Sequence, residues 1–243
     1  MPLNAMAHVH FISGNLRRSL EVLQQSLSII AEYNTKQQEN TVRRNLVSIH
    51  INLGEFSKAL NVLDRLESDI SESWERVKHD RLRASIQLRQ LAFDKARRTL
   101  LATYESFKQE DAARELSVCL EYLGLLEYYR GRYGKARKYY QQVLDMPEPT
   151  ASAVAQTLRM LTDVYVAEKK WQKATATAKD AEAAILKINE RIELAALWRA
   201  YGQIHTHYGE PERSRDYFRK SIDLLREIGA KYELALSHFA AGE

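Results

Sequence analysis

One short pattern returns six times along this chain of 243 residues. Each copy has a turn residue, an apolar residue two places later, and then a basic residue followed directly by a small one. Successive copies are separated by 40, 37, 40, 38 and 40 residues, because they begin at Gly14, Gly54, Leu91, Gly131, Lys169 and Gly209. Self-similarity at a period of about 20 to 50 residues is typical of repeat proteins. The spacing accommodates one helical hairpin per copy and predicts a stack of six hairpins.

The small residue of each copy predicts where the two helices of a hairpin approach closely. These positions are Ser19, Ala59, Ala96, Ala136, Ala174 and Ser214. A further residue four places after each of them lies on the same helix face and fills the space between the helices. Glycine costs about 1 kcal/mol in a helix relative to alanine, so its recurrence at the first position of the pattern indicates a turn. We therefore expect an all-α protein.

The fourth and sixth copies carry a family resemblance. In order along the chain, the fourth has Leu123-Gly124, Gly131, Ala136, Tyr140 and Pro149, and the sixth has Trp198, Tyr201-Gly202, Gly209, Ser214 and Phe218. This order resembles the tetratricopeptide repeat (TPR), although its usual period of about 34 residues is shorter and the first-helix glycine is replaced in the other copies. Longer helices of this kind are similar to those in TPR arrays of bacterial signalling proteins, such as the maltose-regulator type of transcription activators and the Rap-type quorum-sensing regulators.

The resemblance implies a right-handed superhelical solenoid of about six TPR-like helix-turn-helix repeats plus a C-terminal helix. Residues 1–243 would form this single solenoid, in which each repeat contacts only its neighbours. The last residues read as the first helix of a further hairpin, so we expect a fragment of a longer protein. A helix over residues 230–241 would then leave Leu234, Leu236 and Phe239 on an uncovered face, where self-association through the C-terminal end is expected.

The composition argues for a cytoplasmic protein. Apolar residues make up 45% of the chain, charged residues 28%, and no apolar run approaches the roughly 18 residues that a membrane helix needs. The N-terminus has neither the charge nor the apolar core of a signal peptide. The single cysteine, Cys119, excludes an internal disulfide framework.

The sequence contains no catalytic motif that we recognise. It lacks a GxxxxGK[ST] phosphate loop, a GxGxxG fingerprint and a GxSxG elbow. His10, His50, His205 and His238 occupy the first-helix position where the repeat prefers tyrosine, which indicates a partly buried aromatic slot and not a metal site. We therefore expect a protein that is not an enzyme and needs no metal or cofactor.

A binding groove is the favoured function, because stacked hairpins curve into a concave surface lined by their first helices. The position ten residues before each turn is Asn4, Arg44, Arg81, Glu121, Arg159 and Arg199. Other expected groove residues are Asn45, Asn52, Lys78, Arg89, Tyr122, Tyr128, Tyr129 and Gln203. Arginine binds carboxylates through a planar fork and tyrosine offers rigid contact area, so the predicted partner is a peptide or a protein helix, with an acidic or C-terminal peptide favoured.

Nucleic-acid binding through the basic middle is the alternative. Residues 74–98 hold eight basic and three acidic side chains, a net charge of +5 against +4 for the whole chain. A basic patch of this kind is an electrostatic footprint of nucleic-acid binding. Because a lysine or arginine precedes the small residue in every copy, much of this charge is also explained by a solvated helix flank.

Overall fold

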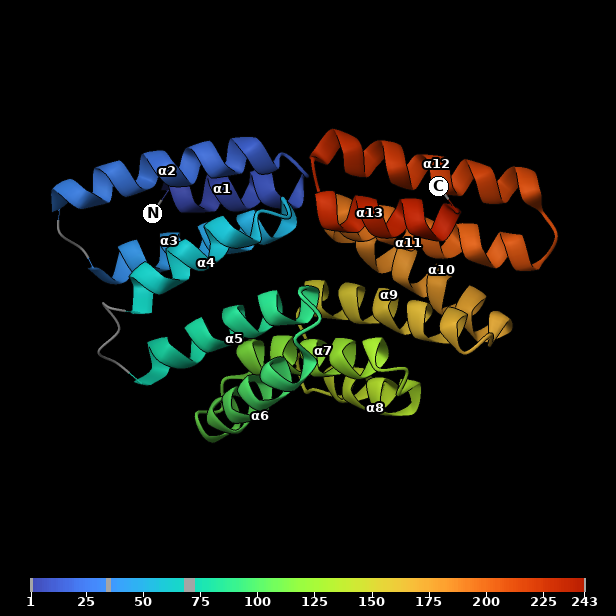
Figure 1. Ribbon diagram of the computed structural model, residues 1–243, viewed down its shortest axis with the longest axis horizontal. Helices are drawn as coiled ribbons and strands as arrows, with labels where there is room; N and C mark the ends of the chain where they lie inside the picture. The colour runs from blue at the N-terminus through green and yellow to red at the C-terminus, as the bar shows by residue number, and fades with distance from the viewer. Residues whose placement is uncertain (1, 34–35, 68–72, 243) are drawn as a thin grey trace.

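The computed structural model describes residues 2–33, 36–67 and 73–242. Within these residues it contains thirteen α-helices and no β-strand (Figure 1). The helices are α1 (Pro2–Ile12), α2 (Leu16–Tyr33), α3 (Lys36–Asn52), α4 (Phe56–Glu67), α5 (Ser73–Arg89), α6 (Phe93–Gln109), α7 (Ala113–Tyr129), α8 (Tyr133–Leu144), α9 (Ala151–Ala167), α10 (Trp171–Ile188), α11 (Arg191–His207), α12 (Pro211–Ile228) and α13 (Lys231–Ala241). Six consecutive hairpins followed by a single helix confirm the expected all-α repeat solenoid.

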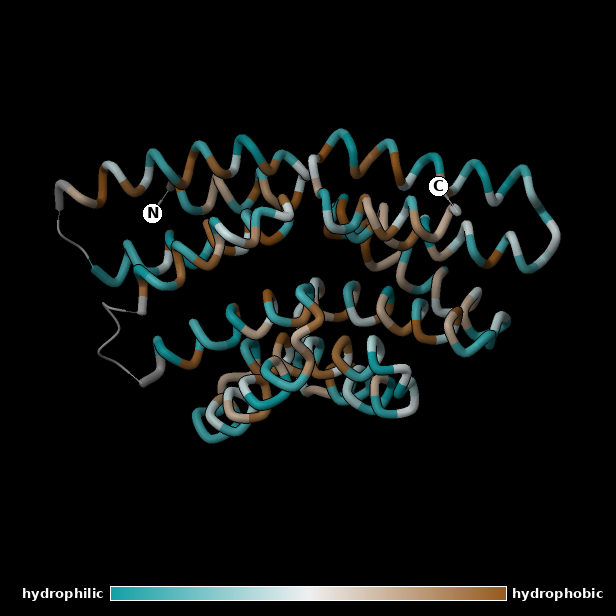
Figure 2. Tube along the Cα trace, viewed as in Figure 1, coloured by the Kyte–Doolittle hydropathy of each residue, from teal (hydrophilic) through white to brown (hydrophobic). Residues whose placement is uncertain are grey.

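The small residues lie between the helices of their hairpins, as the sequence pattern predicts. All six are buried, and the four alanines among them are completely inaccessible to solvent. The two serines add a hydrogen bond to the contact: Ser19 Oγ donates to the carbonyl of Ala7 at 2.6 Å, and Ser214 Oγ to that of Gly202 at 2.9 Å. Figure 2 shows hydrophobic and hydrophilic residues interspersed along the helices, as in amphipathic helices that bury one side.

The turns have one backbone geometry. The φ angles of Gly14, Gly54, Leu91, Gly131, Lys169 and Gly209 are between 58° and 77°, so all six turn residues are left-handed. In the second hairpin Gly54 N–H donates to the carbonyl of Ile51 at 3.0 Å and Glu55 N–H to that of His50 at 2.8 Å. These two bonds define the Schellman motif, which satisfies the last carbonyls of a helix and favours glycine at the left-handed position. The predicted turn residues are therefore confirmed.

The same geometry pairs two side chains that flank the turn. His50 Nδ1 lies 2.7 Å from Glu55 Oε2, and His205 Nδ1 lies 2.6 Å from Glu210 Oε2. The hydrogen bond from His205 lowers the pKa of Glu210. The histidines do sit in a half-buried slot, and the carboxylate after the turn gives each ring a polar partner.

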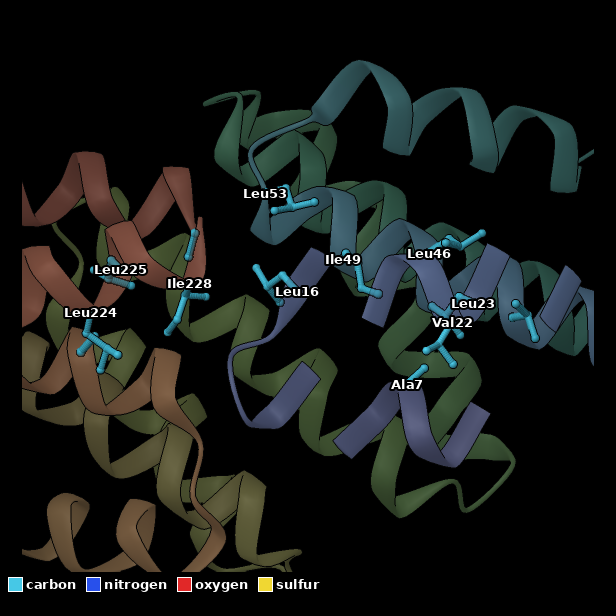
Figure 3. Close-up of a cluster of buried hydrophobic side chains, with 13 residues drawn as sticks. Ala7, Leu16, Val22, Leu23, Leu46, Ile49, Leu53, Leu224, Leu225 and Ile228 are labelled. Carbon is cyan, nitrogen blue, oxygen red and sulfur yellow. The ribbon is translucent and has the colours of Figure 1, made fainter. Parts of the chain in front are cut away.

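The array closes on itself, because its curvature brings the sixth hairpin next to the first (Figure 1). Leu16 of α2 and Leu53, which follows α3, face Ile228 of α12, and one buried hydrophobic cluster contains residues from both ends (Figure 3). A Cβ atom on Gly14 would lie 2.8 Å from Ile228 Cγ1, so the first turn packs directly against α12. The expectation that each repeat contacts only its neighbours is therefore wrong for the two ends of the chain.

Helix α13 strengthens this closure. It packs against α11 and α12, as expected for residues 230–241, and it also contacts α3. The hydroxyl groups of Tyr232 and Tyr129 are 2.9 Å apart, and the Tyr232 ring meets the ring of Phe56 edge-on at 6.3 Å. Leu234 packs into the shared cluster and does not lie on an uncovered face, whereas Phe239 is 85% exposed. Helix α13 thus connects the end of the array with α4 and α7.

Candidate binding channel

The helices surround two adjoining cavities of about 360 and 390 Å³. Seven residues line both, so we treat the two cavities as one channel; they are Asn52, Arg89, Val118, Tyr122, Gln156, Ile192 and Glu193. Most channel residues come from the first helices of the hairpins and from α13, with a small contribution from α2. The concave side of the array therefore forms a partly enclosed channel.

The predicted groove residues divide into two groups. Nine of the twelve line the channel: Asn45, Asn52, Arg89, Tyr122, Tyr128, Tyr129, Arg159, Arg199 and Gln203. Arg44, Lys78 and Arg81 line neither cavity. Arg44 precedes Glu75 in the sequence and Lys78 follows it, and both form an ion pair with the Glu75 carboxylate. A role of the nine channel residues in binding a ligand stays a prediction.

The arginine column forms a ladder between consecutive hairpins. The pairs are Arg44 with Glu75, Arg159 with Glu193, and Arg199 with Glu233, the last two at 2.8 Å. In each pair the arginine is the ninth residue of a first helix and the glutamate the third residue of the next first helix. A glutamate in the first turn is also stabilised by the helix dipole. Sequence reasoning missed this role, although the repeated glutamate was a visible signal.

The arginines of these ion pairs balance the charge of the carboxylates inside the channel. Burial alone would raise the pKa of Glu233, but the charges of Arg199 and Arg159 lower it. Arg159 also donates to Asp163 at 2.8 Å, so one guanidinium serves two carboxylates. The guanidinium groups of Arg159 and Arg199 are thus occupied by the protein's own acidic side chains.

Glu121 breaks the arginine column in the fourth hairpin. Its side chain is only 5% exposed and lines the second cavity, where its Oε1 accepts a hydrogen bond from Thr157 Oγ1 at 3.3 Å. Burial raises the pKa of Glu121 to about 8, with the charge of Glu193 as the next cause. The nearby Arg159 only partly opposes these effects. Burial therefore favours the protonated form of Glu121 at neutral pH.

Several channel residues were not predicted. Val118 lies four residues before Tyr122, and Gln156 lies three residues before Arg159, so helical spacing alone places each on the face of a predicted neighbour. No helical spacing from a predicted residue indicated Tyr232, because this residue reaches the channel only through the closure of the array. Leu236 and Phe239 border the second cavity from the same helix.

Some basic side chains within residues 74–98 and in the following hairpin are paired with acidic side chains. Arg83 pairs with Asp64, Arg130 with Asp94, and Arg137 with Glu168. Each pair connects a hairpin to its neighbour. These ion pairs hold neighbouring hairpins together, which explains part of the positive charge without a nucleic-acid ligand.

None of the helices in the described part of the chain combines the length and the apolarity needed to cross a membrane. No curated protein matches the chain significantly in sequence.

Three solved structures have a similar fold. A Rap protein complexed with competence and sporulation factor aligns with a TM-score of 0.70 and 13% identity over 93% of this chain and 74% of that one. The apo form of RapI gives a TM-score of 0.57 and 13% identity, with 93% and 97% covered. BtubC (BKLC) from P. vanneervenii gives 0.56 and 14% identity, with 88% and 92% covered. At these identities the similarity shows the fold alone.

A family model described as tetratricopeptide repeat matches residues 116–146. The match covers most of α7 and all of α8, which form the hairpin with Gly124, Ala136 and Tyr140. The Cβ position of Gly124 is only 2.3 Å from the Tyr140 ring, so the repeat's characteristic glycine makes room for the second helix. The fourth hairpin therefore matches the tetratricopeptide repeat family, and the described chain as a whole has the fold of the repeat solenoids named above.

Proposed function

We propose that this protein is a non-catalytic interaction module that binds a short peptide, or an extended segment of a partner protein, in the channel. The proposal places the ligand between the first helices and α13. Each cavity is within the range of about 300 to 1,000 Å³ that is usual for ligand pockets.

Polar side chains with spare hydrogen-bonding capacity are the observation that carries this proposal. Tyr122, Tyr128 and Gln203 line the channel, and within the described residues their side chains form no hydrogen bond. All three side chains are partly exposed, so their polar groups are accessible to hydrogen-bond with a polar ligand. An amide such as that of Gln203 can both donate to and accept from a peptide backbone. Leu125, Met160 and Phe239 add apolar contact surface.

The fold also supports a role in bacterial signalling or transcription regulation. The Rap protein of similar fold was crystallised with competence and sporulation factor, so an array of this shape can hold a regulatory ligand. We infer that the present chain is the sensor or scaffold part of such a protein.

A channel-filling substitution tests the proposal. Val118→Trp places an indole where both cavities meet, and Ala102→Trp places the same side chain on the exposed face of α6 as a matched control. Each protein is mixed with a library of linear hexapeptides, separated by gel filtration, and the retained peptides are identified by mass spectrometry. We expect retention by the native chain and the α6 variant, and loss in the Val118→Trp variant. Equal retention by all three, or none by the native chain, would refute channel binding.

A salt titration separates this function from nucleic-acid binding. Binding to single-stranded RNA through phosphate contacts weakens steeply with salt, in proportion to the number of phosphates neutralised. Tight, steeply salt-dependent binding of an RNA oligonucleotide that Val118→Trp leaves unchanged would favour the basic surface instead.

A further inference from the structure

Arg89 differs from the other arginines of the second cavity. Arg159 and Arg199 are held by carboxylates of the next hairpin. Arg89, the last residue of α5, forms no ion pair within the described residues. The groups that Arg89 contacts directly are neutral, although its charge also helps to lower the pKa of the nearby Glu233. Arg89 Nη1 donates to the carbonyl of Ser85 at 3.1 Å, and its guanidinium lies over the ring of Tyr232 at 5.5 Å from the centroid.

The position of Arg89 is central. It lines both cavities, together with Asn52 and Tyr122, at the place where they join. A guanidinium has five N–H donors, and the single hydrogen bond to Ser85 leaves the others for a ligand. The cation–π contact with Tyr232 and the hydrogen bond to Ser85 restrict the side chain, which reduces the conformational entropy lost on binding.

The acidic residues that line the same cavities narrow the class of anion. Glu190 lines the first cavity and accepts hydrogen bonds from Ser152 and Gln156, with no cationic partner in the described residues. Glu193 lines both cavities. Arg159 compensates the charge of Glu193, but the uncompensated Glu190 would repel a doubly charged phosphate more strongly than a singly charged carboxylate. The channel therefore favours a carboxylate at Arg89.

We propose that Arg89, together with the hydroxyl of Tyr122, which lines the same two cavities, anchors a carboxylate of the bound peptide and sets the specificity of the channel. This inference rests on the proposed peptide-binding function and names the chemical group that the peptide must present. Three arginines of the predicted column, Arg44, Arg159 and Arg199, hold neighbouring repeats together, whereas Arg89, which forms no ion pair in the described residues, receives the ligand.

The test uses three hexapeptide libraries. The first has one fixed glutamate and an amidated C-terminus, the second has no acidic residue and a free C-terminus, and the third has neither carboxylate. We expect the native chain to retain the first or the second library at least tenfold better than the third, which identifies a side-chain or a terminal carboxylate as the source.

Two substitutions assign the preference to Arg89. Arg89→Gln should abolish it, with at least a tenfold loss of affinity for the selected peptides, whereas Arg98→Gln, on the exposed face of α6, removes the same charge and should leave it unchanged. If Arg89→Gln fails to fold by circular dichroism, Tyr122→Phe removes only one hydroxyl and should weaken carboxylate peptides selectively.

The outcomes distinguish this inference from the proposed function. Retention of all three libraries alike, or an unchanged carboxylate preference in both channel variants, refutes the role of Arg89 and leaves peptide binding in place. Retention of no peptide by the native chain refutes both.

Discussion

Replacing Glu121 by glutamine should change how the stability of this protein depends on pH. The glutamine has nearly the same shape and can still accept the hydrogen bond from Thr157, but it cannot ionise. Comparing the two proteins therefore isolates the effect of one buried carboxyl group. It lies at the position, ten residues before the turn, that arginine occupies in most other hairpins.

The magnitude follows from the raised pKa. Native Glu121 keeps its proton up to about pH 8, whereas the unfolded chain loses it near 4.5. Between these values the native state binds one more proton than the unfolded state, so stability falls by about 1.4 kcal/mol per unit of rising pH. The stabilisation that protonated Glu121 contributes is fully present below pH 4.5 and is lost as the pH rises to about 8. Over the whole window it is on the order of 5 kcal/mol.

Urea unfolding of both proteins at pH 5, 6, 7 and 8 measures the effect. We expect free energies of unfolding within about 1 kcal/mol of each other at pH 5, and a Glu121→Gln variant that is more stable than the native protein by several kcal/mol at pH 8. Glu105→Gln, on the exposed side of α6, controls for the change in net charge. If the difference between the Glu121→Gln variant and the native protein is the same at pH 5 and pH 8, Glu121 is not protonated in the native state and the reasoning fails.

Three further predictions concern packing. Gly124→Ala should lower the free energy of unfolding by at least about 1 to 3 kcal/mol, because its Cβ would lie 2.3 Å from Tyr140, whereas Gly134→Ala in the same hairpin meets nothing closer than 3.9 Å and should gain up to about 1 kcal/mol. Urea unfolding measures both, and equal stabilities would contradict the described hairpin. Ala136→Leu should overpack the same contact and cost about 1 to 3 kcal/mol, so an unchanged melting temperature would count against the assigned register. Burial raises the pKa of the Cys119 thiol to about 11, so a thiol reagent at pH 8 should modify Cys119 in urea but not in the native protein, and rapid native labelling would disprove its burial.

The hairpins themselves were predictable because their signals are local. A turn residue such as Gly54 must adopt a positive φ, and a small residue such as Ala59 must sit where two helices meet, so both requirements recur with every repeat. Leu91 and Lys169 occupy the same left-handed position without being glycine, and only their place in the pattern revealed them.

The candidate site was predictable in part. Helical periodicity places Tyr122, Arg159 and Arg199 on the inner face, and the structure finds them there. The partners of the arginines were not predictable in the same way, because Glu193 and Glu233 each lie 34 residues further along the chain on the next first helix. Contacts between hairpins therefore decide which arginine has no ion pair and can bind a ligand.

The sequence by itself determined the number of hairpins, their turns and the residues between their helices, since each of these is set within one repeat. The tertiary structure alone decided that the array closes. The contact of Gly14 with Ile228 depends on the small rotation of every hairpin relative to the last, which accumulates over the whole array and is written in no single repeat. That closure brings Tyr232 across to Arg89 and Tyr129 and turns an open concave face into a channel.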